Sequence, residues 1–295
     1  MPSLWRQRAR QSFLFLKVTE DIRALQDKDL RALQELLQRN KIINVVPIAH
    51  LETRARHYLR SPIDDFVGLF DNGILQSAVL TGANLMPINI QREDILPFAE
   101  FLRGLGRRAS SIVGPSQQVL PLWSALEPTW GSAREVRHSQ PYLSMANYSK
   151  IEIDENVRYS TRMDLDILFP ACVDMFTQEV GVSPILHGSA AYRSRVSEII
   201  SQRHSFIRNS GDEVVFKAEV GVVSSDVAQI QGVWVNPKFR GQNLAASAMS
   251  AVVKYLIDDI APVATLYVNS FNKPALATYL KTGFVQVDNF TTVLF

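Results

Sequence analysis

Hydrophobic positions in residues 214–223 alternate with polar ones. Valine, phenylalanine and alanine occupy the even positions, while Lys217 and Glu219 lie between them. This period of two predicts a strand with one apolar face and one face that carries Lys217 and Glu219. A Ser-Ser-Asp turn follows, so residues 227–235 are expected to form the partner strand.

Other segments of the C-terminal half show helical periodicity or the length of a short strand. Asn272 is placed to cap a helix that has Pro274 in its first turn and Gly283 just beyond its end. The predicted order is helix, helix, strand, strand, helix, strand, helix, strand, which is typical of an α/β layer with a largely antiparallel beginning. The helices are expected at residues 165–180, 190–203, 243–257 and 273–281, and the further strands at residues 264–268 and 284–295.

The N-terminal half mixes helix and strand signals around one clear turn. Asn72-Gly73 supplies positive φ angles between two apolar runs, which predicts a hairpin. A polar stretch at residues 146–157 suggests a boundary, so we expect an N-terminal α/β domain at residues 1–150 and a second domain at residues 151–295. The expected N-terminal strands cover residues 66–70, 74–75, 76–80 and 111–115, and the helices residues 27–38, 93–102 and 119–126.

The composition is that of an ordinary globular protein. The 295 residues are 46% hydrophobic and 20% charged, with a net charge of +2, so no global field favours nucleic acid. The basic residues 5–10 are interpreted as a solvated terminus rather than a contact for an anionic partner. No run approaches the roughly 18 apolar residues of a membrane span, and no secretory signal is evident. We therefore predict a cytoplasmic protein without a membrane partner.

Cysteine and histidine usage argues against disulfide and metal sites. Cys172 is the single cysteine and has apolar neighbours, which excludes an intrachain disulfide and predicts a buried, inert thiol. The five histidines are scattered without metal-ligand spacing, so no metal is expected.

The junction between residues 235 and 245 is the strongest candidate for ligand binding. A strand ends there, a loop with Arg240 and Gly241 follows, and a helix begins. Backbone N–H groups at a helix start lack intrahelical partners and bind phosphate oxygens well. The loop lacks the Gly-Lys-Ser/Thr ending of a Walker motif and the Gly-x-Gly-x-x-Gly of a dinucleotide site.

A second segment joins this loop to a known family. Asn272, Ala275, Tyr279, Gly283 and Phe284 fit the pattern Asn-x-x-Ala-x-x-x-Tyr-x-x-x-Gly-Phe. Together with Arg240-Gly241-Gln242-Asn243-Leu244-Ala245, this segment resembles the GCN5-related N-acetyltransferase (GNAT) superfamily.

The family's loop pattern is Arg/Gln-x-x-Gly-x-Gly/Ala, so Asn243 departs from the usual glycine. Asparagine tolerates positive φ angles, which keeps the loop conformation accessible. The resemblance covers roughly residues 158–295. It implies a mixed sheet flanked by helices and acetyl-CoA as co-substrate.

The whole chain also resembles actinobacterial two-domain GNAT proteins with an uncharacterised N-terminal domain. The order of elements in the first half would suit a degenerate copy of the same fold. Tandem acetyltransferases of about this length have that plan, with one half catalytically silent.

The resemblance also implies roles for individual residues. Tyr279 is the candidate general acid, and its alternative is a tyrosine that packs a helix on the sheet. Glu219 is the candidate base, and its alternative is a solvated strand carboxylate paired with Lys217 or a neighbouring strand. Glu179 is expected either to recognise a cationic acceptor or to be a surface carboxylate.

Coenzyme contacts are implied mainly for main-chain groups. Val233, Trp234 and Val235 would bind the pantetheine arm through their backbone, although Trp234 also suits a core position. Asn272 would bind the coenzyme arm, cap its helix, or do both. The remaining expected coenzyme contacts are Arg240, Gly241, Gln242, Asn243, Leu244 and Ala245.

These observations lead to one predicted function and one alternative. The prediction is an acetyl-CoA-dependent N-acetyltransferase that acts on a primary amine of a small molecule or peptide. The alternative is a non-catalytic, coenzyme A-binding regulatory or scaffolding protein.

Overall fold

The computed structural model describes residues 21–57, 63 and 65–295; the basic segment at residues 5–10 lies outside them. In the N-terminal half, strands and helices alternate around one hairpin, and an η1 turn (Asp27–Asp29) precedes the first helix. The elements are β1 (Asp21–Ala24), α1 (Leu30–Gln38), α2 (Val45–His57), β2 (Phe66–Asp71), β3 (Ile74–Thr81), β4 (Asn84–Ile88), α3 (Ile95–Leu105), β5 (Ser111–Pro115), α4 (Ser116–Trp130) and β6 (Glu135–Met145).

The C-terminal half begins after a loop at residues 146–157, and an η2 turn (Arg162–Asp164) again precedes its first helix. Its elements are β7 (Arg158–Tyr159), α5 (Leu165–Val180), α6 (Ala190–Ser201), β8 (Ser205–Ser210), β9 (Glu213–Val223), β10 (Val227–Val235), α7 (Leu244–Asp259), β11 (Val263–Tyr267), α8 (Lys273–Thr282) and β12 (Val285–Leu294). A short η3 turn (Pro237–Phe239) lies between β10 and α7.

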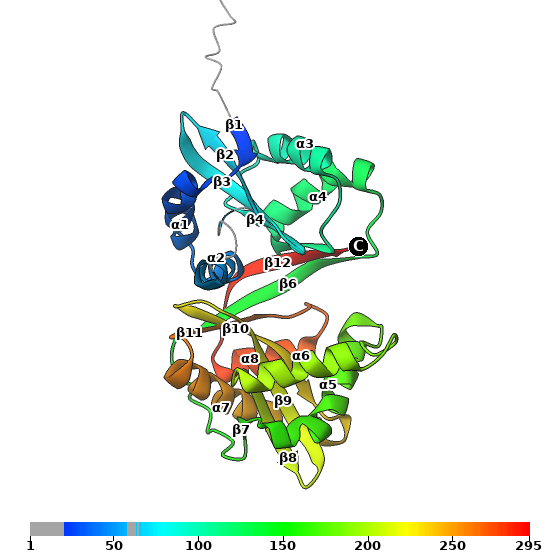
Figure 1. Cartoon of the computed structure of the whole chain (residues 1–295). Coiled ribbons are helices and arrows are strands. Elements are labelled where there is room, and N and C mark those ends of the chain that lie inside the picture. The colour runs from blue at the N-terminus through cyan, green and yellow to red at the C-terminus, as the bar shows by residue number, and fades with distance from the viewer. Residues whose placement is uncertain (1–20, 58–62, 64) are drawn as a thin grey trace, which may run out of the picture.

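The two halves repeat one order of elements. Each runs strand, helix, helix, three strands, helix, strand, helix, strand. Figure 1 shows the halves above and below a central pair of strands, β12 and β6. This duplication agrees with the expected degenerate copy in the first half.

Within the described residues, twelve strands form one continuous sheet. Its order is β1-β2-β3-β4-β5-β12-β6-β11-β10-β9-β8-β7, so the last strands of the halves are exchanged. β12 pairs with β5 of the N-terminal half, whereas β6 pairs with β11 of the C-terminal half. A domain boundary at residue 150 remains a proposal, because each half completes its sheet with a strand from the other.

A matching salt bridge opens each half. Arg23 binds both carboxylate oxygens of Asp29 at 2.7 and 3.0 Å, and Arg158 binds both of Asp164 at 2.8 Å. In both places the aspartate also accepts a backbone N–H three residues before it, as in a capping box. The same residue types therefore fix the entry to the first helix twice.

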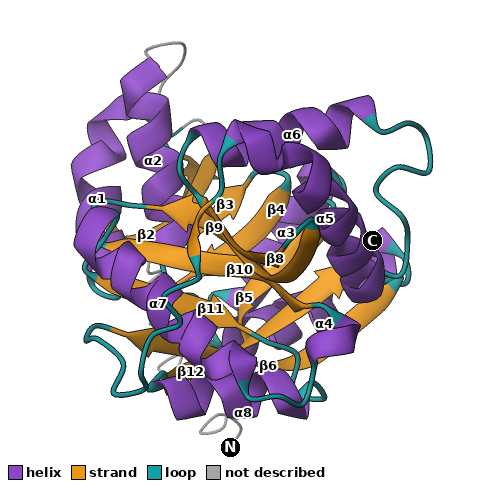
Figure 2. Ribbon diagram, turned by 90° about the horizontal axis from the view of Figure 1, so that it is seen from below, coloured by secondary structure: helices purple, strands orange, loops and turns teal. Residues whose placement is uncertain are grey.

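Helices cover both faces of the sheet (Figure 2). In the C-terminal half, α7 and α8 bury one face of β9 through residues such as Met249 and Phe216, while α5 and α6 bury the other around Cys172 and Trp234. In the N-terminal half, α1 and α2 cover one core, and α3 and α4 cover another. The expected mixed α/β fold is confirmed.

Most predicted elements are present, with specific exceptions. The hairpin turn has positive φ angles at Asn72 (49°) and Gly73 (80°), as its sequence requires, and α5 has the predicted bounds. The two strands expected at residues 74–80 form one strand, β3. The predicted order omitted β8, the neighbour of β9, and no expectation was formed for α2, β4 or β6.

Candidate functional site

The candidate site opens where two parallel strands separate. β10 pairs with β11 only through residues 227–229, and then continues to Val235 beyond that pairing. On its other edge, β10 stays paired with β9, with an irregularity between Gln231 and Trp234. The edge of β10 toward β11 is therefore left without a strand partner over residues 230–235.

The loop after β10 turns the chain into α7 with two left-handed residues. Asn236 caps the η3 turn by accepting the Lys238 N–H at 3.1 Å. Gly241 has φ of 78°, and Asn243 has φ of 59° and is the N-cap residue of α7. The structure thus gives Asn243 the positive φ that its side chain tolerates.

Backbone N–H groups of this loop are available to a ligand. Among the residues that the structure describes, Gly241, Gln242 and Asn243 donate no backbone hydrogen bond. The first N–H groups of α7 likewise have no intrahelical acceptor. The helix dipole adds positive potential at the same point, so the loop suits phosphate oxygens.

Arg240 adds a cation beside these N–H groups. Its side chain is exposed, and its Nε donates to the Val235 carbonyl at 3.0 Å. Its Nη2 donates to Oε1 of Gln178, near the end of α5, at 3.0 Å. Neither partner is an anion, so the positive charge of Arg240 is not neutralised by these contacts.

The equivalent loop of the N-terminal half is closed by its own side chains. Asp94, the N-cap residue of α3, is buried, and its carboxylate accepts the Gln91 N–H at 2.9 Å. The Ile90 N–H is bound by Oε1 of Gln118 at 2.9 Å. A carboxylate at this helix start would repel a phosphate, so among the residues that the structure describes this loop is less suited to an anion than the loop before α7.

Tyr279 lies on α8 with most of its side chain buried, at 7% exposure. It contacts Phe284 edge to face, with ring centroids 6.2 Å apart. Burial, and then the negative charge of Glu179, raises the pKa of the Tyr279 hydroxyl well above its ordinary value. The charge of Glu179 thus acts on Tyr279, and the sequence had singled out the two residues separately.

Glu179 is exposed at the end of α5 beside the exchanged strand. Arg137 of β6 donates to the Glu179 main-chain carbonyl at 2.9 Å, and its guanidinium is also paired with Glu135 at 2.9 Å. Sequence reasoning did not find Arg137, because its position depends on the exchange of β6 and β12.

Glu219 is buried, with 7% exposure, and paired with a buried lysine. Lys217 Nζ lies 2.5 Å from Oε1 of Glu219, and Cys172 Sγ lies 3.6 Å from the same oxygen. Oε2 accepts no hydrogen bond from the described residues. The alternative from the sequence was a solvated Glu219 carboxylate paired with Lys217. The pairing is present, but both side chains are buried under α5.

Two further residues have the predicted structural positions. Asn272 caps α8 by accepting the Ala275 N–H at 3.3 Å. Cys172 is buried, and burial raises the pKa of its thiol to about 11. A thiol in this state is protonated at neutral pH, as expected for an inert cysteine.

Trp234 is a core residue whose side chain packs against α5 and α6. Its Nε1 is buried without a hydrogen-bond partner among the described residues. Val233 and Val235 on either side of it are partly buried. Any role of this segment toward a ligand therefore falls to the main chain.

The N-terminal half braces the turn between β9 and β10. The Glu52 carboxylate of α2 accepts the Ser225 N–H at 3.1 Å, and Lys41 lies 3.1 Å from the Asp226 carboxylate. The halves are thus held together by polar contacts as well as by the shared sheet.

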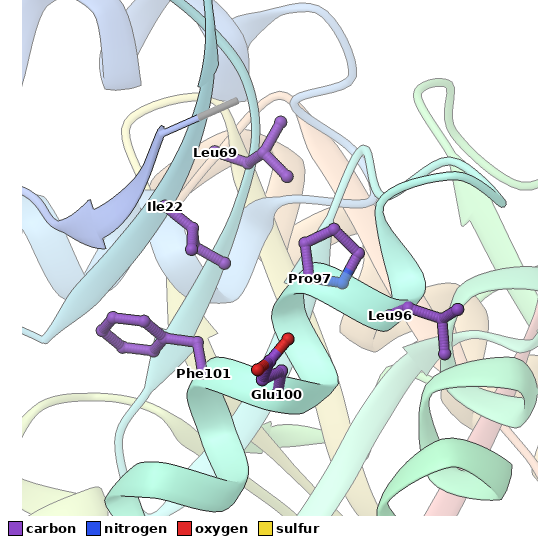
Figure 3. Close-up of a pocket in the computed structure, with 6 residues that line it drawn as sticks. All are labelled: Ile22, Leu69, Leu96, Pro97, Glu100 and Phe101. Atoms are coloured by element: carbon purple, nitrogen blue, oxygen red, sulfur yellow. The ribbon is translucent and has the colours of Figure 1, made fainter. Parts of the chain in front are cut away.

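A separate apolar pocket lies in the N-terminal half, away from this site. It has a volume of about 410 Å³ between α3 and the β1–β2 edge, with Glu100 at its rim (Figure 3). Within residues 21–57, 63 and 65–295, no three His, Cys, Asp or Glu side chains gather as a metal site. In the same part of the chain, no helix is long and apolar enough to cross a membrane.

Comparison with family models agrees with this geometry. Residues 65–168 match a domain of unknown function, DUF4081, and residues 185–284 match the acetyltransferase (GNAT) family. The GNAT-family match therefore lies within the C-terminal half. The match spans the strand separation, the loop before α7 and Tyr279. Among curated proteins, the comparison finds no match.

Solved structures share the fold along almost the whole chain. A GNAT-family acetyltransferase from Colwellia psychrerythraea is 13% identical with a TM-score of 0.52, covering 93% of this chain and 99% of its own. A GCN5-related N-acetyltransferase from Sphaerobacter thermophilus is 12% identical with a TM-score of 0.58, covering 92% and 94%. A Drosophila protein is 11% identical with a TM-score of 0.63, covering 94% and 99%. At 11–13% identity, these structures show that the chain shares their fold over both halves.

Proposed function

We propose that this protein transfers an acetyl group from acetyl-CoA to a primary amine of a small molecule or peptide. The observation that carries the proposal is the loop before α7. Its N–H groups at Gly241, Gln242 and Asn243 have no partner among the described residues, and Arg240 stands beside them. They lie at the end of β10, whose edge toward β11 is unpaired over residues 230–235.

In this proposal, the loop and the first turn of α7, with Leu244 and Ala245, bind the pyrophosphate of coenzyme A. The pantetheine arm then lies along the open edge of β10, where it pairs with the main chain of Val233, Trp234 and Val235. Asn272 adds a contact to the arm from the start of α8. An extended amide chain suits this edge, because strand edges present regularly spaced N–H and C=O groups.

The chemical step is the attack of a neutral amine on the thioester carbon. The C–N bond forms and the C–S bond breaks, so the amine must lose a proton and the departing thiolate must gain one. We propose that Oε2 of Glu219 accepts the proton that the amine loses. The hydroxyl of Tyr279 donates a proton to the departing thiolate. The hydroxyl of Tyr279 is protonated at neutral pH and so has a proton to donate, while burial and the charge of Glu179 raise its pKa and make it a weaker acid than a free tyrosine.

Glu179 is proposed to attract the cationic form of the acceptor. It is exposed, and its charge acts on Tyr279. An amine held between the two residues would approach the thioester from the end of α5.

The test is thiol release from acetyl-CoA in the presence of a panel of amines, with wild type compared with Tyr279→Phe. Loss of a general acid costs roughly 10²–10⁴-fold in turnover, while acetyl-CoA binding should be unchanged. If the phenylalanine variant turns over as fast as wild type, Tyr279 is not the acid. If no amine supports thiol release although acetyl-CoA binds, the non-catalytic coenzyme A-binding alternative replaces the enzyme.

The pH dependence gives a second check on Tyr279. Because its pKa is raised, the protonated form persists as the pH increases, and the hydroxyl should not titrate between pH 7 and 9. We expect no fall in turnover from Tyr279 over this range. A fall that is present in wild type and absent in Tyr279→Phe would contradict the assignment.

A further inference from the structure

A buried ion pair lies directly beneath the irregular part of β10. The Lys217 side chain has no exposed surface, and its Nζ has two partners: Oε1 of Glu219 at 2.5 Å and the carbonyl of Gly232 at 3.0 Å. Burial lowers the pKa of Lys217, but the charge of Glu219 and the contacts with Glu219 and Cys172 outweigh it, so the pKa is raised. The ammonium is therefore retained in the interior.

Gly232 is the residue at which β10 leaves its ladder with β9. The register passes from Gln231 directly to Trp234, and Gly232 has φ of 58°. A Cβ at this position would lie 3.2 Å from Lys217 Nζ, from Oε2 of Glu219 and from Cε of Met175. The bulge and the ion pair are thus packed against each other, and the glycine permits the contact.

The Lys217 ammonium gives the Gly232 carbonyl a hydrogen-bond partner that the pairing of β10 with β9 does not provide. This carbonyl is partly buried, and Lys217 donates to it from the neighbouring strand. Buried ion pairs are seldom needed for stability, because apolar residues of similar volume serve as well or better. The pair holds Gly232, which lies within the open edge of β10 and directly before Val233, and this favours a role in shaping that edge.

We propose that Lys217 is a positioning residue: held by Glu219, it fixes the carbonyl of Gly232 and thereby the main chain of Val233 to Val235 that receives the coenzyme arm. The expected effect on acetyl-CoA binding rests on the proposed function. The control of the bulge by Lys217 is independent of that function. Glu219 then has two tasks, with Oε1 holding Lys217 and Oε2 facing Gly232.

Other ionisable groups around the pair come from the two covering helices. Cys172 of α5 lies 3.6 Å from Oε1 of Glu219, and Tyr192 of α6 has its pKa raised by burial, by Cys172 and by Glu219. Both groups are neutral at pH 7. A test at neutral pH therefore reports on Lys217 and Glu219 without a charge change from these neighbours.

The experiment uses Lys217→Met/Glu219→Leu, which removes both charges together. Replacing Lys217 alone would leave a buried carboxylate without a partner and endanger folding, whereas the double variant should fold. The control is Lys254→Met/Asp258→Leu, which removes an exposed pair on α7. Two readouts are the backbone amide NMR signals of Gly232 and Val233 without ligand, and the Kd of acetyl-CoA by calorimetry.

We expect the double variant to shift both amide signals and to weaken acetyl-CoA binding at least tenfold, with a melting temperature close to that of wild type. Gly232→Ala should weaken binding similarly, because its Cβ contacts the same groups. Unchanged amide signals in a folded double variant would overturn the inference, and so would an unchanged Kd. If wild type itself binds no acetyl-CoA, the proposed function fails, while the amide signals still decide whether Lys217 holds the bulge.

Discussion

Asn243 occupies a position where glycine is usual in GNAT loops, and its backbone shows why asparagine is accepted. With φ of 59° it is left-handed, a conformation that costs most L-residues roughly 1–2 kcal/mol and asparagine less. The sequence predicted this tolerance from residue type alone.

Substitutions at Asn243 should separate backbone from side-chain effects. Asn243→Gly is expected to keep both acetyl-CoA affinity and stability, since glycine adopts this φ freely. Asn243→Val should lower the melting temperature by about 2–4 °C for each kcal/mol of strain and weaken binding. The measurement is thermal unfolding together with calorimetric titration. Equal behaviour of the two variants would show that the left-handed conformation does not matter to the loop.

The limits of residue-level prediction are visible at Glu219 and Lys217. Their alternation on one strand showed that they share a face, and this was confirmed. Their burial was not predictable from the strand, because it depends on α5 lying across them with Cys172 and Met175.

At the scale of elements, the short strand and turn that open each half are held by equivalent Arg–Asp pairs. The bond from Arg158, together with those from Thr161, lowers the pKa of Asp164 to about 2, against the opposing effect of burial. A carboxyl with a lowered folded-state pKa contributes stability above its unfolded pKa of about 3.9. That contribution is lost as the pH falls toward 2.

Asp164→Asn should therefore lower the free energy of unfolding at pH 7 by about 1.5–3 kcal/mol, the range for hydrogen bonds to a charged group. The difference from wild type should shrink as the pH falls from 4 to 2. Urea unfolding at several pH values measures both effects. Asp166→Asn is the control, since Asp166 forms an exposed pair with Arg193 that should contribute little. A difference at Asp164 that is independent of pH would contradict the account.

Elements with strong local signals were predictable, and those defined by long-range pairing were not. The Asn72-Gly73 turn and the bounds of α5 follow from local chemistry. β6 contains Pro141 and lies between β12 and β11, which are distant in sequence. Its identity as a central strand depends on partners that no local pattern specifies.

At the scale of the whole molecule, two copies of one fold share a sheet through exchanged strands, and within the described residues the loop before α7 has free N–H groups where the loop before α3 has bound ones. The duplication was predicted from element order, whereas the exchange of β6 and β12 was not. The exchange places Arg137 next to the end of α5, where it donates to the main-chain carbonyl of Glu179, so a strand of the first half contacts a helix of the second.

This arrangement predicts a single coenzyme site per chain. Asp94 and Gln118 already bind the N–H groups of Gln91 and Ile90 in the loop before α3, while the N–H groups of Gly241, Gln242 and Asn243 before α7 have no such partners within the described residues. Binding should therefore depend on Arg240 and be indifferent to charge changes elsewhere on the surface.

The most direct test is calorimetric titration of the full chain with acetyl-CoA, beside Arg240→Glu and the control Arg31→Glu on the exposed face of α1. The account predicts one site per chain for wild type and for Arg31→Glu, at micromolar strength. It predicts a loss of roughly 10- to 100-fold for Arg240→Glu, as expected when a charged contact to phosphate is reversed. Absence of binding in wild type, or equal binding by Arg240→Glu, would contradict the assignment of the loop before α7 as the coenzyme site.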